Sequence, residues 1–180
     1  APAFEQEFNE IVHAGLASTP YQQTDDTSAR VEGQFWHTHI LCNPFYAAYF
    51  TRAHKDRLTV LEVLQNIGPQ NTGALRFQFG AEALALLRAE FHIPDKWQQV
   101  IGDMGEVQFN RQSLAALLDG WFDSGNQQVR TAIEHATAIV YYRHQTAVPV
   151  VETLVCDDAS QFKLLTAHLA ACWIHDGRHY

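Results

Sequence analysis

The sequence predicts an α/β protein in the element order β-β-β-α … β-α, interrupted by an all-helical insertion. Three β-forming runs follow one another in the first half of the chain. A block rich in Ala, Leu and Gln then extends from about residue 74 to residue 146. A further β-branched run begins at Val150 and ends in two aspartates. We therefore expect one sheet, formed by the two ends of the sequence, with the helical block inserted between them.

The first half is expected to form a helix followed by three strands. Residues 1–17 carry one apolar stripe at helical spacing, which Gly15 and Pro20 then break. The turn signal Asn43-Pro44 separates the second strand from the third, so the simplest arrangement is an antiparallel meander. The predicted strands are Tyr21–Thr24, which leads into Asp25-Asp26-Thr27, then Arg30–Cys42 and Phe45–Thr51.

Helices are predicted from residue 58 to the end of the insertion. Asn110 and Asn126 stand where N-caps are expected. The predicted helices are Leu58–Gln65, Ala81–Phe91, Ser113–Phe122 and Gln127–Tyr142. The resulting domain organisation is a connecting helix over residues 1–18, a core over 19–67 and 147–180, and a helical insertion over 68–146.

The last stretch of the chain is predicted to be a buried strand followed by a helix. Apolar residues between Val150 and Val155 lead directly into Asp157 and Asp158. Phe162, Leu165, Leu169 and Cys172 then recur at spacings of three and four, which is typical of a helix. Acidic residues at the C-terminal end of a buried strand stand where α/β proteins carry their chemistry.

Composition favours an ordinary globular protein of the cytoplasm. The 180 residues are 47% hydrophobic and 18% charged, with no apolar run long enough to span a membrane. Three cysteines without paired spacing indicate reduced thiols. A net charge of −8 makes the chain a poor autonomous nucleic-acid binder. The sequence begins without Met and stops without a closing element, so we expect it to be truncated at both ends.

The two pairs of aspartates are the strongest chemical signal. Asp25-Asp26 and Asp157-Asp158 each stand at or near a predicted strand, and neighbouring parallel strands would bring them close together. Carboxylates at that distance repel unless a cation separates them, and Mg²⁺ prefers such oxygen ligands. The alternative is that all four are turn and N-cap residues. Which member of each pair would face a metal depends on the strand register.

These residues resemble a known family. Leu154-Val155-Cys156-Asp157-Asp158-Ala159, followed by the segment from Cys172 to Tyr180, is similar to the DDE transposases of bacterial insertion sequences, in particular the insertion-sequence sixty-six-like group. Gln23-Thr24-Asp25-Asp26-Thr27 resembles the Asp-Glu-Thr segment of that group, with Asp26 in place of Glu. The similarity covers roughly residues 20–66 and 147–180, and its C-terminal signature is the more specific part.

The resemblance implies an RNase H-like fold, with a five-stranded mixed sheet whose first and fourth strands lie side by side. It implies that Asp25 and Asp157 are catalytic and bind Mg²⁺ or Mn²⁺, with Asp26, Asp158, His175 and Arg178 as neighbours. A third acid, a glutamate on a later helix, is expected beyond Tyr180. The implied reaction is phosphodiester hydrolysis at transposon ends followed by strand transfer into target DNA. The implied setting is a homo-oligomer bound to DNA in the bacterial nucleoid, away from membranes.

Other residues have weaker functional interpretations. His37-x-His39 and Cys172-x-x-His175 with His179 have loose zinc spacing. The densest basic cluster, Arg52, His54, Lys55 and Arg57, is a weak candidate for DNA contact, although a solvated strand end explains it equally well. The four tryptophans are expected in the core.

Two further functions stay open. The chain could be a non-catalytic RNase H-like remnant or interaction domain, which keeps the fold without turnover. It could also be a stand-alone metal-dependent nuclease or phosphatase, with its remaining ligand among Glu32, Glu62 and Glu152.

Overall fold

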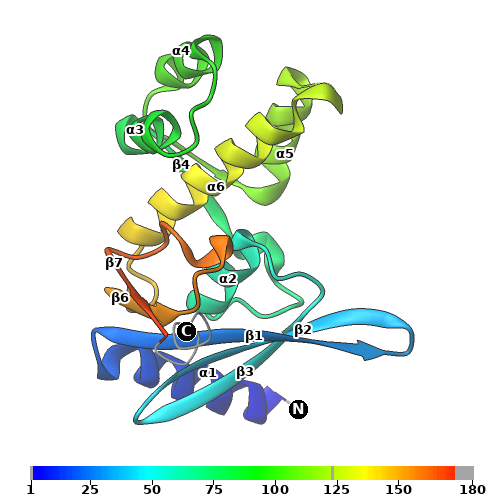
Figure 1. The fold of residues 1–180 in the computed structure, drawn as a ribbon, viewed down its shortest axis with the longest axis vertical. Coiled ribbons are helices and arrows are strands. Elements are labelled where there is room, and N and C mark those ends of the chain that lie inside the picture. Colours follow the sequence, from blue (N-terminus) through cyan, green and yellow to red (C-terminus); the bar gives the residue numbers. More distant parts are fainter. Residues whose placement is uncertain (1, 123, 173–180) are drawn as a thin grey trace, which may run out of the picture. The chain divides into compact units, whose positions relative to one another are not determined.

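The computed structural model describes residues 2–122 and 124–172 and divides the chain into two compact units (Figure 1). Unit 1 comprises the residues up to Gln70 and those from Gln145 onward, and unit 2 is the continuous segment Asn71–His144. Within the described ranges, none of the helices combines the length and the apolar character that a membrane span requires.

Unit 1 is built on a five-stranded mixed sheet, which confirms the predicted α/β class. The strand order is β3-β2-β1-β6-β7. β2 pairs antiparallel with both β1 and β3, whereas β6 pairs parallel with both β1 and β7. The strands are β1 (Tyr21–Val31), β2 (Gln34–Asn43), β3 (Tyr46–Arg52), β6 (Thr153–Cys156) and β7 (His168–Ala171).

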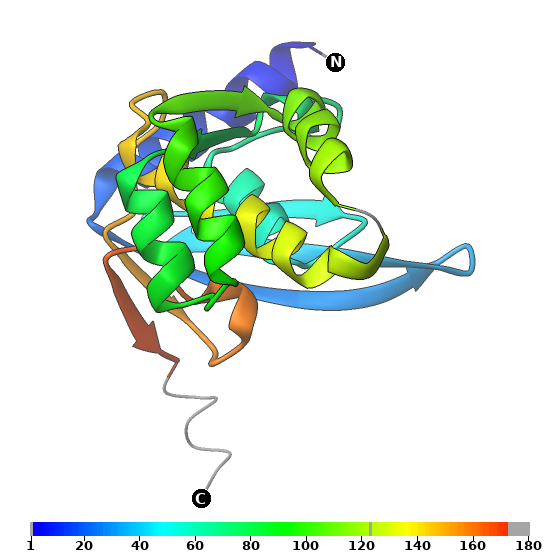
Figure 2. The same ribbon diagram turned by 90° about the horizontal axis from the view of Figure 1, so that it is seen from above.

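The hairpin between β1 and β2 differs from the prediction. β1 continues through Asp25 and Asp26 as far as Val31, so these acids lie inside the strand and not after it. Glu32 and Gly33 form the turn with φ values of 51° and 81°, and positive φ at both positions is the pattern of a type I′ hairpin. The hairpin is a long ribbon that continues past the residues paired with β3 and β6 (Figure 2).

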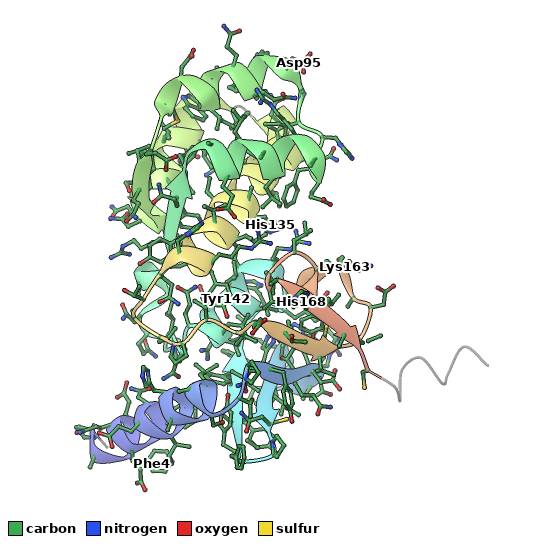
Figure 3. All side chains as sticks on the ribbon, turned by 90° about the vertical axis from the view of Figure 1, so that its left-hand side faces the viewer. Phe4, Asp95, His135, Tyr142, Lys163 and His168 are labelled. Carbon is green, nitrogen blue, oxygen red and sulfur yellow. The ribbon has the colours of Figure 1, made fainter. Side chains whose placement is uncertain are left out.

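Two helices cover one face of this sheet: α1 (Pro2–Ser18) and α2 (Arg57–Leu64). Gln22 on β1 donates to the carbonyl of Gly15 in α1 at 3.3 Å, and Phe8 of α1 meets Phe50 of β3 edge to face. The expected apolar stripe of α1 is only partly used, since Phe4 is 72% exposed and projects into solvent (Figure 3). α2 begins at its N-cap Asp56, close to the predicted bound.

The helix predicted after Asp158 is wrong. The chain forms a short 3-10 turn, η3 (Ser160–Phe162), and then the strand β7. Phe162 and Leu165 are buried from a connecting segment, and Leu164 has a φ of 72°, which an α-helix cannot contain. Of the residues whose spacing suggested a helix, Phe162 and Leu165 anchor this connection, whereas Leu169 lies in β7 and is 44% exposed.

Unit 2 is not all-helical, because it contains a two-stranded antiparallel sheet of β4 (Arg76–Phe79) and β5 (Val107–Asn110). Phe77 and Phe79 alternate with polar residues and are buried. Trp97 stacks on Trp121, and its ring centroid lies 4.3 Å from that of Phe122. Trp97 is buried as expected, whereas Trp121 and Trp36 are only half-buried, and Trp173 lies outside the described residues. The helices are α3 (Ala81–Ala89), α4 (Asp95–Met104), α5 (Arg111–Trp121) and α6 (Gln127–His144), with 3-10 turns η1 (Thr72–Ala74) and η2 (Ser124–Asn126). Of these helices, α4 was not predicted from the sequence.

Side-chain hydrogen bonds stabilise the starts of two helices in unit 2. Asn110 caps α5 as predicted, in a capping box with Ser113. At the start of α3, the Glu106 carboxylate accepts hydrogen bonds from the Ala81 N–H and from the Gln78 side chain. Gly80 lies between them with φ +149°, and a Cβ at that position would come within 2.2 Å of the Glu106 oxygens.

Candidate functional site

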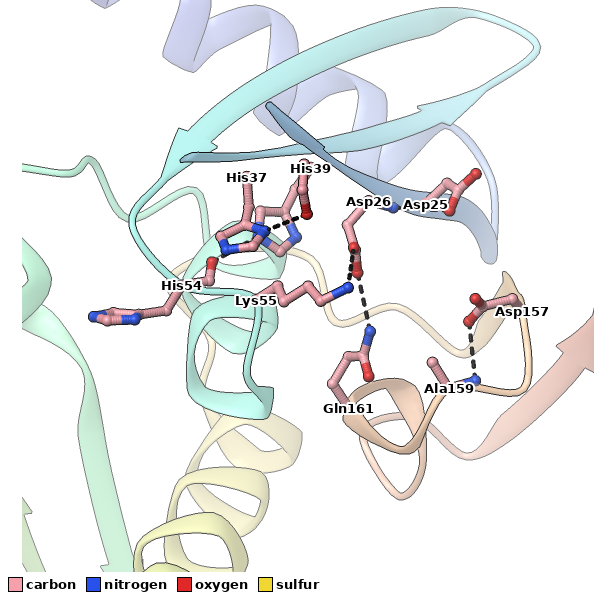
Figure 4. A network of polar contacts seen from close by, with 10 residues as sticks. Asp25, Asp26, His37, His39, His54, Lys55, Asp157, Ala159 and Gln161 are labelled. Carbon is pink, nitrogen blue, oxygen red and sulfur yellow. Dashed lines mark hydrogen bonds and ion pairs between the residues drawn. The ribbon is translucent and has the colours of Figure 1, made fainter. Parts of the chain in front are cut away.

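The acids Asp25 and Asp157 occupy matching positions on neighbouring parallel strands. β1 and β6 pair in a register that sets Gln23 opposite Val155. Asp25 and Asp157 each follow two residues later, Asp25 within β1 and Asp157 directly after β6 (Figure 4). The arrangement depends on the short, buried β6, in which Leu154 and Cys156 face the core.

The Cys156 thiol, at the end of β6, is affected by the charges of several nearby carboxylates. Burial is the main cause that raises the pKa of the Cys156 thiol to about 12, and the charges of Asp157, Asp158 and Asp25 and the neighbouring Cys172 raise it further. Three carboxylates thus act on one thiol. This end of the parallel strands is therefore a region of concentrated negative charge.

Each acid near β6 has a distinct environment. The Asp157 Oδ1 accepts the backbone N–H of Ala159 at 3.0 Å, which closes a tight turn after the strand. The Asp25 Oδ1 accepts the backbone N–H of Asp26 at 2.8 Å. Asp158 has a side chain that is 87% exposed and pairs with Lys163 at 2.8 Å. The carboxylates of Asp25 and Asp157 therefore each organise the local backbone.

Asp26 points to the opposite face of β1 from Asp25. Its side chain continues the buried row of Gln22 and Thr24 and is only 7% exposed. One carboxylate oxygen lies 3.4 Å from the Lys55 Nζ, and the other accepts from the Gln161 Nε2 at 2.9 Å (Figure 4). No sequence pattern pointed to Gln161, because its contact with β1 spans 135 residues of the chain.

Histidines line the same face of β2. His39 stands opposite Asp26 in the β1–β2 register, and burial lowers its pKa, so the neutral imidazole is favoured. The His39 Nε2 lies 3.1 Å from the carbonyl of His54, and its buried Nδ1 has no hydrogen-bond partner. The His37 Nδ1 lies 2.8 Å from the Ser28 Oγ (Figure 4). These contacts take one nitrogen of each imidazole in the predicted His37-x-His39 zinc motif.

The basic residues predicted to contact DNA have structural partners. Arg52 is 6% exposed and donates to the carbonyl of Ile67 at 2.7 Å, while Arg57 donates to the carbonyl of Ser160 at 2.6 Å. Burial lowers the pKa of both guanidinium groups. Lys55, which is half exposed, pairs with Asp26. A role of these residues in DNA contact stays a prediction.

Three predicted site residues lie outside the described ranges: His175, Arg178 and His179. Within the described ranges, no three His, Cys, Asp or Glu side chains form a group that could hold a metal ion. Glu32 stands in the β1–β2 turn, Glu62 lies on α2, where its charge acts on Arg52, and Glu152 precedes β6. The structure thus supplies the pair Asp25 and Asp157 without a third described ligand.

Comparison with known proteins adds one relative. The chain is 28% identical over 173 residues to a protein of Sinorhizobium fredii described as "uncharacterized protein y4jO". The match covers 93% of this chain and 50% of the relative, so the chain spans about half of that protein's length. No family model matches the chain, and no solved structure matches it.

Proposed function

We propose that the chain is the catalytic region of a DDE-type DNA transposase, in which Asp25 and Asp157 hold Mg²⁺ or Mn²⁺. The observation that carries this proposal is the parallel pairing of β1 with β6, which sets the two aspartates at corresponding positions of adjacent strands. Turn and N-cap roles alone would not require the two segments to pair in this register.

The sheet supports an RNase H-like fold as part of the same proposal. β1 and β6 are the first and fourth strands of the five-stranded sheet in chain order, and they lie side by side. An RNase H-like sheet has this neighbour relation. The departure is the connection from β6 to β7, which contains the 3-10 turn η3 in the place where the family resemblance implied a helix.

The donor set fits a hard divalent cation. Two carboxylates offer the oxygen ligands that Mg²⁺ prefers, and Mg²⁺ usually keeps several waters, so two protein ligands suffice for weak binding. The negative charge that raises the pKa of Cys156 is the field that a cation would neutralise. A bound Mg²⁺ would supply positive charge beside a phosphodiester during phosphoryl transfer. DNA as substrate and homo-oligomerisation belong to this proposal for the whole protein.

A Mn²⁺ titration of the 180-residue chain, followed by electron paramagnetic resonance, tests the metal site. We expect saturable binding that Asp25→Asn and Asp157→Asn each weaken by more than about tenfold, because even changes outside the first coordination shell cost 10–100-fold. Asp158→Asn is the matched control, since Asp158 is exposed and paired with Lys163. Unchanged affinity in both Asp25→Asn and Asp157→Asn would overturn the proposal.

The second candidate function is a non-catalytic RNase H-like interaction domain. The observation that favours it is the lack of a three-residue metal-binding group within the described ranges. This alternative predicts no saturable Mn²⁺ binding by the wild-type chain. The same titration therefore separates the two functions.

A further inference from the structure

Asp25 and Asp26 are adjacent in sequence, yet their side chains meet different parts of unit 1. Asp25 stands at the position of β1 that matches Asp157 in the β1–β6 register. Asp26 is buried on the other face of β1, where it contacts Lys55 and Gln161 (Figure 4). Alternation along a strand makes this division of roles a property of the register.

The contact with Gln161 ties β1 to the segment that carries Asp157. Gln161 belongs to η3, which begins three residues after Asp157. Its amide donates to Asp26 at 2.9 Å, and Lys55 supplies a positive charge to the same carboxylate. A carboxylate that is 7% exposed needs such partners, because an unpaired buried charge is costly.

Two further contacts hold the same segment. Arg57, at the start of α2, donates to the carbonyl of Ser160 at 2.6 Å. The ring of Phe162 is buried. The segment between β6 and β7 is thus held by contacts with β1, with α2 and with the core. Asp157 lies in the chain between the end of β6 and η3.

We propose that Asp26 is a positioning residue: through Gln161 it fixes the η3 segment and thereby the Asp157 carboxylate, while Asp25 is the residue that meets the metal. This inference rests on the proposed metal site. It assigns separate functions to two neighbouring aspartates that the sequence could not distinguish.

The test combines hydrogen exchange with the Mn²⁺ titration on four variants of the 180-residue chain. Gln161→Leu removes the donor and Asp26→Ala the acceptor, and Asp26→Asn keeps an oxygen that Gln161 can reach. Lys163→Met is the matched control, because it breaks the exposed pair with Asp158 and leaves Asp26 untouched. Thermal unfolding of each variant verifies that it folds.

We expect amide exchange in residues 158–162 to rise about tenfold in Gln161→Leu and Asp26→Ala, the effect of losing one charge-assisted hydrogen bond. Lys163→Met should leave that exchange unchanged. Mn²⁺ affinity should fall about tenfold in the first two variants and return toward the wild-type value in Asp26→Asn, as for residues that orient a ligand.

The outcomes separate this inference from the proposed function. Unchanged amide exchange in residues 158–162 of both Gln161→Leu and Asp26→Ala would show that the Asp26–Gln161 contact does not hold the η3 segment, and would overturn the inference. Loss of Mn²⁺ binding in Asp26→Asn, with full affinity in Gln161→Leu, would make Asp26 itself a ligand and would also overturn it. If the wild-type chain binds no Mn²⁺, the proposed function and the positioning role both fall, and the exchange data then report only a structural contact.

Discussion

The buried Cys156 thiol makes the free energy of unfolding of unit 1 depend on pH in the alkaline range. Its thiol has a pKa of about 12 in the folded chain, whereas an unfolded cysteine ionises near 8.5. A raised folded pKa means that the stabilising contribution is complete below the unfolded pKa and is lost as pH rises toward the folded pKa. The sign is therefore a loss of stability above about pH 8.5.

Urea unfolding between pH 7 and 11 measures this contribution. The unfolding free energy of the wild type should fall relative to that of Cys156→Ala, with a slope approaching about 1.4 kcal/mol per pH unit above pH 9. The comparison cancels the titration of tyrosines and lysines, which both proteins share. Parallel curves for the two proteins would contradict the assignment.

At the residue scale, the sequence singled out two pairs of aspartates but did not show where each side chain points. The two aspartate pairs and the strand before Asp157 were visible as patterns. The assignment of Asp25 and Asp26 to opposite faces needed the register of β1, since a slip of one residue exchanges them. Gln161 could not be predicted at all, because its partner lies 135 residues away.

Among the elements, the junction of β4, α3 and β5 depends on a glycine. Gly80 has a backbone conformation open only to glycine, and its missing side chain leaves room for the Glu106 carboxylate that binds the start of α3. We expect Gly80→Ala to lower the free energy of unfolding by about 1–3 kcal/mol. Chemical denaturation followed by circular dichroism measures the change.

Gly120→Ala is the matched control for this junction. Gly120 is an exposed position of α5 where an added Cβ meets no atom within 4 Å. Alanine there should raise stability by about 0.5–1 kcal/mol, because glycine is a poor residue inside a helix. A destabilisation of equal size in both variants would show that the Glu106 contact is not the cause.

The longest helices of unit 2 were predictable, although the ten-residue α4 was missed, and of the four-residue strands only β6, with its β-branched run, was found. α5, with its cap at Asn110, and α6 carry three or more turns of helical spacing and were found. β4, β5 and β7 have four residues each, and periodicity cannot separate a strand from a helix over so short a run. For β7 the deciding factor is its pairing with β6, which belongs to the tertiary structure.

At the scale of the whole molecule, unit 2 should fold on its own. Residues 71–144 are continuous and have a core that includes Phe77, Leu87, Ile101 and Leu118. We expect this fragment to show helical circular dichroism and a cooperative thermal transition. A fragment of residues 71–126, which lacks α6, should remain unfolded, because α6 packs against β4 and α3. Loss of the transition in both fragments would contradict the prediction.

The strand order also means that β1 is synthesised long before its neighbour β6. β1, β2 and β3 leave the ribosome before β6, which follows only after the hundred residues 53–152. At roughly 5–20 residues per second this takes about 5–20 s, during which one edge of β1 has no strand beside it. β6 later pairs with Tyr21–Gln23, and Asp25 and Asp26 follow these residues directly along β1. Charged side chains beside an unpaired strand edge discourage it from pairing with other chains. Asp25, proposed as a metal ligand, and Asp26, proposed as a positioning residue, would thus already protect the nascent chain from aggregation.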